Sequence, residues 1–129
     1  MSIPKELKYS NEHEWVRVNG DTLQIGITTF AVDQLGDVTQ VDLPEVGDSV
    51  VKGEIFGTVE SVKAVSDLFA PISGKVKSSN DPLNDSPEDV NESPYEKGWM
   101  IEITDFDAGD LASLMDSDAY ATFLKEQDA

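Results

Sequence analysis

Short apolar runs separated by turn residues fill most of the chain. Residues 15–27, WVRVNGDTLQIGI, hold two alternating runs around Asn19-Gly20, a dipeptide that tolerates the positive φ angles of a tight hairpin turn. From Asp37 to Val76, further β-branched runs alternate with turn signals: DVTQVDL, VVKGEIFGTVES, AVSDLFAP and ISGKVKS. This spacing predicts a mainly β fold, a sandwich or a barrel of short strands, and not βαβ units.

Two segments interrupt the β pattern. In TTFAVDQLG, Thr28 or Thr29 can cap a short helix that Gly36 ends. Residues 78–98 contain three prolines and no periodic apolar face. This segment therefore predicts a long ordered loop with one helical turn at Pro87–Val90.

The last third of the chain returns to regular structure. Residues 99–104, WMIEIT, predict a strand. Residues 109–129 then carry apolar side chains at near-helical spacing, with Ser117 able to cap a second segment. The positions are Leu111, Leu114, Met115, Phe123 and Leu124. We expect this end to be helical and packed against the sheets.

Length and charge restrict the possible partners. The 129 residues fit one domain, residues 1–129. The formal net charge is −17, from 26 acidic against nine basic residues, and like-charge repulsion opposes binding to nucleic acid or to anionic membranes. We expect partners with basic patches, although acidity that only maintains solubility is an equal alternative.

The chain contains no cysteine, which excludes disulfides, thiolate nucleophiles and cysteine-based zinc sites. No apolar run approaches the length of a membrane span, and MSIPKELKYS resembles neither a secretory signal nor an organellar presequence. The simplest expectation is a soluble cytoplasmic protein, with the mature form of a mitochondrial matrix protein as the alternative.

The spacing of the candidate residues in the sequence argues against a catalytic or metal site. His13 is the only histidine, so HEWVR cannot form the two-histidine zinc motif. Residues 105–116 resemble a calcium loop, but Asp110 replaces the required glycine and Asp116 the usual glutamate, which favours a capped, acidic start of a helix. Glycine-rich phosphate loops are absent. These patterns predict a protein that is not an enzyme.

Lys63 lies within VESVKAVSDLFAP, where two predicted strands reverse direction. It would therefore occupy the exposed tip of a β-hairpin. A Schiff-base nucleophile needs an apolar or cationic environment, whereas the residues near Lys63 include the acidic Glu60 and Asp67, which argues against that role. From the pattern alone, a functional lysine and an ordinary solvated turn lysine both remain open.

ESVKAVSDLFAPISGKV resembles the lipoylation segment of the glycine cleavage system H-protein family. KYSNEHEWV, GITTFAVDQLGDV, VDLPEVG and VNESPYEKGWM resemble the family's other motifs, in the same order. The resemblance implies a flattened β-sandwich or hybrid barrel with a short helix after the first hairpin. It also implies lipoic acid in amide linkage on Lys63, with Glu60 and Gly74 recognised by the lipoylating enzyme.

The resemblance further implies a monomeric, non-catalytic carrier. Pyridoxal-phosphate-dependent glycine decarboxylase would load an aminomethyl group on the lipoyl arm, and an aminomethyltransferase would pass the carbon to tetrahydrofolate. The FAD enzyme dihydrolipoyl dehydrogenase would then reoxidise the arm. Glu14, in HEWV, matches a position that binds the ammonium of the cargo in a surface cleft.

Three other assignments use the same kind of lysine. A lipoyl domain of a 2-oxo acid dehydrogenase would be shorter, would usually show DKA where this chain has VKA, and would continue into a flexible linker. A biotin carrier would normally place methionine on both sides of the lysine, whereas Val62 and Ala64 flank Lys63. A store that relays lipoyl groups to other complexes needs the same Lys63 and stays open.

Overall fold

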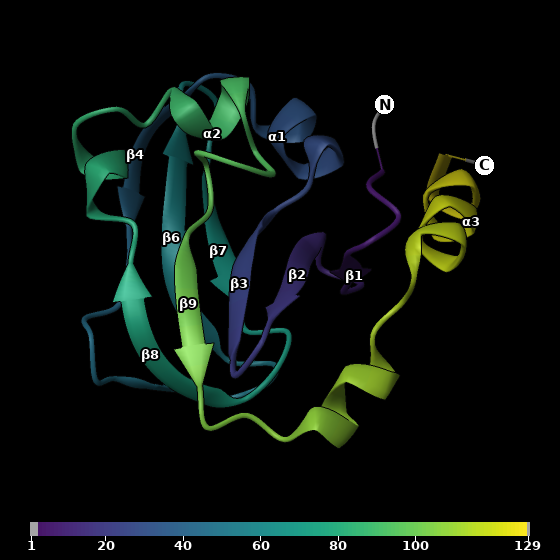
Figure 1. The fold of residues 1–129 in the computed structure, drawn as a ribbon. Helices are drawn as coiled ribbons and strands as arrows, with labels where there is room; N and C mark the ends of the chain where they lie inside the picture. The colour runs from purple at the N-terminus through teal and green to yellow at the C-terminus, as the bar shows by residue number, and fades with distance from the viewer. Residues whose placement is uncertain (1–2, 129) are drawn as a thin grey trace.

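The computed structural model describes residues 3–128 and consists of two antiparallel β-sheets that face one another, with short helices at their margins (Figure 1). The larger sheet has the strand order β1-β2-β3-β9-β8-β5 and the smaller has the order β4-β6-β7. The predicted sandwich is therefore confirmed. Neither sheet closes on itself among the strands that residues 3–128 form.

The strands of the larger sheet are β1 (Lys8–Tyr9), β2 (Glu14–Asn19), β3 (Thr22–Ile27), β5 (Ser49–Val50), β8 (Gly74–Ser79) and β9 (Ile101–Thr104). Those of the smaller sheet are β4 (Val38–Asp42), β6 (Ile55–Ser61) and β7 (Val65–Phe69). The helices are α1 (Thr29–Leu35), α2 (Asp89–Glu92) and α3 (Ser117–Asp128), with 3-10 turns η1 (Asp81–Asn84) and η2 (Ala108–Ser113).

The hairpin and the helix predicted near the N-terminus are both present. β2 and β3 pair from Glu14↔Ile27 to Asn19↔Thr22, and Gly20 in the turn has φ +66°. The α1 helix begins after Thr28, whose side chain accepts a hydrogen bond from the Ala31 amide, and it ends at Gly36 with φ +78°. Local turn and capping chemistry therefore fixes this part of the chain.

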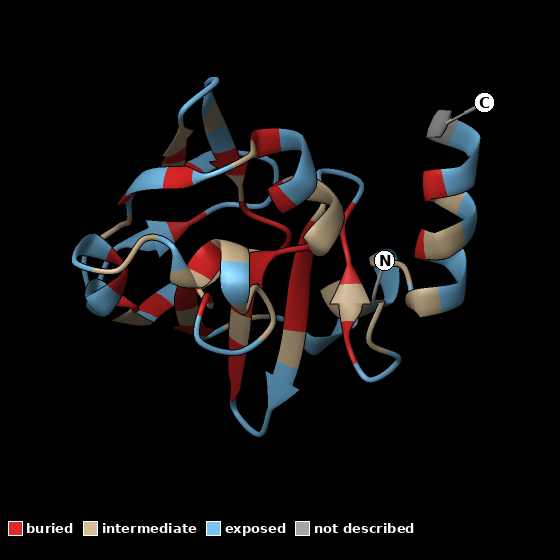
Figure 2. Ribbon diagram, turned by 90° about the horizontal axis from the view of Figure 1, so that it is seen from above, coloured by how far each residue is buried: buried red, intermediate tan, exposed pale blue. Residues whose placement is uncertain are grey.

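Buried aliphatic side chains from both sheets form one core between them (Figure 2). Val16, Ile25 and Ile101 come from the larger sheet, and Val59 and Leu68 from the smaller. These alternate positions of each strand point to the same face, so the two sheets bury a shared apolar layer.

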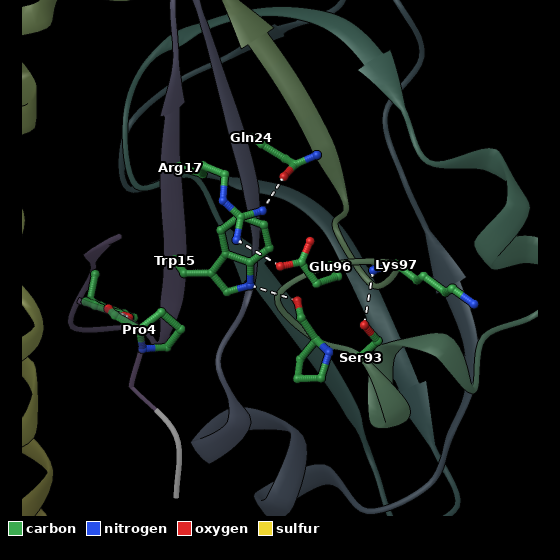
Figure 3. A network of polar contacts seen from close by, with 9 residues as sticks. Pro4, Trp15, Arg17, Gln24, Ser93, Glu96 and Lys97 are labelled. Atoms are coloured by element: carbon green, nitrogen blue, oxygen red, sulfur yellow. Dashed lines mark hydrogen bonds and ion pairs between the residues drawn. The ribbon is translucent and has the colours of Figure 1, made fainter. Parts of the chain in front are cut away.

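The loop that precedes β9 folds over Trp15 (Figure 3). The Trp15 indole N–H donates to the Pro94 carbonyl at 2.9 Å, and the Arg17 guanidinium lies 5.1 Å from the indole centroid. Arg17 also pairs with Glu96 at 3.6 Å. The indole covers Gly26 on the neighbouring strand so closely that a Cβ there would lie 2.6 Å from the ring. This loop therefore covers Trp15, which packs outside the core between the sheets.

Two local predictions need correction. The segment 78–98 contains two short helical elements, η1 and α2, where one turn at Pro87–Val90 was expected, and its first two residues belong to β8. Ser117 is the first residue of α3 and not its cap, because Asp116 accepts the Ala119 amide at 2.8 Å. The acidic start expected after residue 105 is confirmed, since Asp107 caps η2 by accepting the Gly109 amide.

α3 packs apart from the main core. It lies beside β1 at the edge of the larger sheet (Figure 1), where the rings of Tyr9 and Tyr120 stack at 4.6 Å. Leu7, Trp15 and Leu124 complete this second apolar cluster. The helix was expected against the sheets, but it contacts only their margin. No described helix is long and apolar enough to cross a membrane.

Candidate functional site

Lys63 lies in the tight turn that joins β6 and β7, as the strand pattern predicts. The Ser61 amide donates to the Ala64 carbonyl at 2.8 Å, and the Ser61 hydroxyl accepts the amides of Lys63 and Ala64. Lys63 is exposed, and the neighbouring Val62 and Val65 have exposed fractions of 70% and 63%. The turn therefore presents the lysine amine to other molecules.

The Lys63 turn is braced against the end of α1. The Val62 amide donates to the Asp37 carbonyl at 3.1 Å. Asn91 of α2 in turn donates to the Gly36 carbonyl at 2.7 Å and accepts the Val38 amide at 2.8 Å. The aliphatic part of the Lys63 side chain lies against Gly36, because a Cβ at position 36 would be 3.2 Å from Lys63 Cε.

A pocket of about 360 Å³ begins beside this turn. It follows β7, whose outer edge is unpaired in the described sheet, and it is closed on the other side by α1 and by residues 12–14. We call it the β7 pocket. Its lining residues are Glu12, His13, Glu14, Ile27, Phe30, Ala31, Gln34, Leu35, Val59 and residues 65–69.

Glu14 forms the end of the β7 pocket that is furthest along β7 from the Lys63 turn. Its exposed fraction is only 2%, in contrast to an ordinary surface carboxylate. The Ser10 hydroxyl donates to Oε1 at 2.6 Å, and the Phe69 amide donates to Oε2 at 3.4 Å. A hydrogen bond therefore joins the last residue of β7 to this carboxyl group.

Burial raises the pKa of Glu14 from its ordinary value of 4.5 to about 8, although the hydrogen bonds from Ser10 and Phe69 oppose the rise. A buried carboxylate without a cation is costly, and a proton removes the charge. The empty pocket therefore favours the protonated, neutral form of the Glu14 carboxyl group.

A second pocket of about 470 Å³ also borders Glu14 and Phe69. It opens on the side of β1 and η2, where Lys52 donates to the Ser113 hydroxyl at 2.8 Å. None of its lining residues comes from α1 or from the part of β7 next to the Lys63 turn. Of the two pockets, only the β7 pocket extends from Val65, two residues after Lys63, to the buried carboxyl group.

The structure brings Glu60, but not Gly74, close to Lys63 in the fold. Glu60 is on β6 and pairs with Val65 directly below the turn. Gly74 begins β8 of the other sheet, where a Cβ would lie 2.7 Å from the Thr104 carbonyl oxygen. Close packing alone therefore requires a glycine at position 74, whatever other role it has.

Sequence reasoning missed several residues that shape the β7 pocket. Ser10 and Phe69 hold Glu14, but their spacing in the sequence carries no signal of that contact. His13 was considered only as a zinc ligand, whereas its ring lies 4.5 Å from the Phe30 ring in the pocket wall. No group of three or more potential metal ligands occurs in the described part of the chain.

Comparisons with known proteins agree over nearly the whole chain. Residues 7–127 match the family model described as Glycine cleavage H-protein. The glycine cleavage system H protein of Anaeromyxobacter sp. (strain K) is 60% identical over 128 residues, which cover 99% of this chain and 100% of the relative. The relative of the same name from Geobacillus sp. (strain WCH70) is 56% identical and is covered over 99% of its length.

A solved structure shows the same fold. The crystal structure of a glycine cleavage system H protein from Mycobacterium marinum superposes with a TM-score of 0.84 at 38% identity, and the match covers 93% of this chain and 97% of that one. Family model, relatives and structure therefore all lead to one assignment: the chain belongs to the glycine cleavage H-protein family.

Proposed function

We propose that this protein carries lipoic acid on Lys63 and that the β7 pocket receives the loaded arm, with Glu14 binding its cargo. Family membership supports a lipoyl-carrier role in glycine cleavage. The observation that carries the finer proposal is the course of the pocket, which follows β7 from the Lys63 turn to the buried Glu14 carboxyl group.

The length of the pocket suits a lipoyl-lysine side chain. From Val65 to Phe69 the strand advances about 13 Å, at roughly 3.3 Å per residue. A lysine extended by a lipoyl chain has roughly eleven bonds between its Cα and the dithiolane ring, each advancing about 1.25 Å, which gives about 14 Å. The arm on Lys63 is therefore long enough to bring its sulfur atoms near Glu14.

The lining of the pocket suits the same group. Ile27, Leu35 and Leu68 offer apolar surface to a hydrocarbon chain, and Glu14 offers a buried carboxyl group at the end, whereas the carboxyl groups of Glu12 and Asp67 belong to exposed residues. When bound, the lipoyl group supplies a disulfide that accepts a one-carbon unit on sulfur. Walls of this kind exclude water from the cargo, which protects a group that hydrolyses readily.

The raised pKa of Glu14 fits a cationic cargo. In the empty pocket a proton neutralises the carboxyl group, and an arriving ammonium group can replace that proton. Below about pH 8, binding of the ammonium at Glu14 therefore releases a proton to solvent. Ser10 keeps its hydrogen bond to Oε1 in either state, because its hydroxyl is the donor.

The partner reactions follow from the family. We infer that glycine decarboxylase supplies the aminomethyl group, that the aminomethyltransferase transfers its carbon to tetrahydrofolate, and that dihydrolipoyl dehydrogenase reoxidises the arm. The protein itself contributes no chemical step in this proposal. Its net charge of −17 favours docking to basic patches on these enzymes.

We propose that the lipoylating enzyme recognises Glu60 and Gly74. Glu60, directly below the Lys63 turn, is well placed for contact with a lipoylating enzyme, and Gly74 stays a candidate for the same recognition.

We propose one domain, because residues of both sheets share one core, and a monomer. The named relatives are bacterial, which favours the cytoplasm over the mitochondrial matrix. A lipoyl-relay role would use the same Lys63.

Lipoylation in vitro tests the proposal at its first step. Incubation with a lipoate ligase, lipoate and ATP, followed by peptide mapping by mass spectrometry, should place one lipoyl group on Lys63. Lys63→Arg should accept none, whereas the control Lys75→Arg, on β8, should be modified like the wild type. Lipoate on the Lys63→Arg variant would show that the attachment site lies elsewhere.

A further inference from the structure

Tyr120 of the C-terminal helix contacts, through one hydroxyl group, both segments that form the wall of the β7 pocket opposite β7. Tyr120 is fully buried, and its oxygen lies 2.9 Å from His13 Nδ1 and 2.7 Å from Thr28 Oγ1. His13 belongs to residues 12–14, the first segment of this wall. Thr28 is the N-cap of α1, the second segment. A residue more than 90 positions away in sequence therefore connects the two segments.

The donors and acceptors of this contact form a consistent chain. Thr28 Oγ1 accepts the Ala31 amide, which leaves its own proton free to be donated to the Tyr120 oxygen. Tyr120 can then donate its proton to His13 Nδ1. Burial lowers the pKa of His13, with Glu12 opposing the shift, so the ring is neutral and its Nδ1 can accept.

The His13 backbone needs this support. Its φ angle of +68° is in the left-handed region, which a residue with a Cβ adopts only when its surroundings hold it there. The His13 amide donates to the Ser10 carbonyl, and its carbonyl accepts the Thr28 amide. The ring lies between those of Phe30 and Phe123, at 4.5 and 5.8 Å. Because Glu14 follows directly, a shift of His13 would also move the carboxyl group.

We propose that the Tyr120 hydroxyl is a positioning group for the β7 pocket: it ties His13 to the start of α1 and so holds the wall opposite β7, and Glu14 with it, in the arrangement that encloses the arm. α3 then helps to shape the β7 pocket, in addition to covering β1. This inference rests on the proposed docking of the arm in the β7 pocket, and it adds a residue that touches neither arm nor cargo.

The chain offers a matched control for this role. Tyr9 is equally buried, and its ring is stacked on that of Tyr120 with only 5° between the planes. Its hydroxyl donates to the Pro4 carbonyl, and Tyr9 lines the second pocket and not the β7 pocket. Tyr9→Phe and Tyr120→Phe therefore each remove one buried hydroxyl from the same pair of rings, but only Tyr120→Phe breaks the link between His13 and the start of α1.

The first readout is the His13 imidazole in the unlipoylated protein. His13 is the only histidine, so long-range ¹H–¹⁵N spectra report on it alone. Wild type and Tyr9→Phe should show the tautomer with the proton on Nε2 and a hydrogen-bonded Nδ1. Tyr120→Phe should shift the Nδ1 resonance toward that of a free imidazole. Identical spectra for Tyr120→Phe and wild type would overturn the inference.

The second readout is the release of formaldehyde from purified, aminomethyl-loaded protein without tetrahydrofolate. Loss of one hydrogen bond of ordinary strength should speed release about threefold or more in Tyr120→Phe. Tyr9→Phe should release at the wild-type rate. Equal rates for the two variants, with faster release from Glu14→Gln, would overturn the role of Tyr120 and leave the docking proposal standing. Equal rates for wild type and Glu14→Gln would instead contradict docking itself.

A second pair of variants keeps the test decisive if Tyr120→Phe does not fold. Thr28→Ser retains the hydroxyl that reaches Tyr120, whereas Thr28→Val removes it at nearly the same volume. The inference predicts faster formaldehyde release from the valine variant and wild-type release from the serine variant. Equal release from the two Thr28 variants would contradict it.

Discussion

The hydroxyl of Ser10 donates a 2.6 Å hydrogen bond to Oε1 of Glu14 and accepts the Glu14 backbone amide at 3.1 Å. One serine therefore holds both ends of the buried glutamate. A donor at this position stabilises the carboxylate form, so it opposes the effect of burial on the Glu14 pKa. The balance between burial and this bond determines when Glu14 itself carries a negative charge.

Ser10→Ala should raise the pKa of Glu14 further above its value of about 8, because the main opposing hydrogen bond is lost while burial remains. A ¹³C NMR titration of the side-chain carboxyl group measures this directly. Ser113→Ala is a suitable control, since its hydroxyl contacts Lys52 and the Asp110 carbonyl and not Glu14. An unchanged Glu14 pKa in Ser10→Ala would show that the bond does not act as described.

The same carboxyl group should make folding stability depend on pH. Glu14 binds its proton more tightly when folded, with a pKa of about 8, than when unfolded, where 4.5 is the ordinary value. The free energy of unfolding should therefore decrease between about pH 4.5 and 8, by an amount on the order of a few kcal/mol. Glu14→Gln should remove this part of the decrease. Urea denaturation at pH 5 and pH 8 measures it, and equal decreases in wild type and variant would contradict it.

Docking to at least one partner enzyme should be steered by the acidic surface. The net charge of −17 attracts basic patches at long range. Association should slow as ionic strength rises, since the Debye length shrinks from about 10 Å at 0.1 M to about 3 Å at 1 M. Stopped-flow measurement with each purified partner tests this. An association rate that stays flat across the range for every partner would exclude steering.

Much of the fold could be predicted because its signals are local. Asn19-Gly20 specifies a hairpin from two adjacent residues, and Thr28 and Gly36 specify both ends of α1. The Lys63 turn follows from the two strands beside it. Each of these depends on residues within a few positions of one another, so the pattern along the chain contains the information.

Contacts between distant segments could not be predicted in the same way. Alternation along β2 does not reveal that Glu14, Trp15 and Val16 are all buried, because Glu14 is covered by Ser10 and by the end of β7. Tyr120 was not among the predicted apolar positions of α3, although it is the most buried residue of the helix. Its partners lie in segments that only the folded chain brings together.

In the proposed function, Glu14 holds the cationic cargo inside the β7 pocket. Glu14→Gln keeps the shape of the side chain but removes its charge. A hydrogen bond to a charged group contributes roughly 1.5–3 kcal/mol and a neutral one about 1 kcal/mol, so the docked state should lose population about tenfold. Asp33→Asn, an exposed position on α1 outside the pocket, controls for the change in net charge.

The most direct measurement is the rate of ammonia and formaldehyde release from aminomethyl-loaded protein, without tetrahydrofolate or partner enzymes, between pH 6.5 and 8.5. We expect faster release from Glu14→Gln than from wild type or Asp33→Asn. The difference should widen toward pH 8.5, because below pH 8 the cargo must first displace the Glu14 proton. Equal rates for wild type and Glu14→Gln at every pH, with loading confirmed by mass, would show that Glu14 does not hold the cargo.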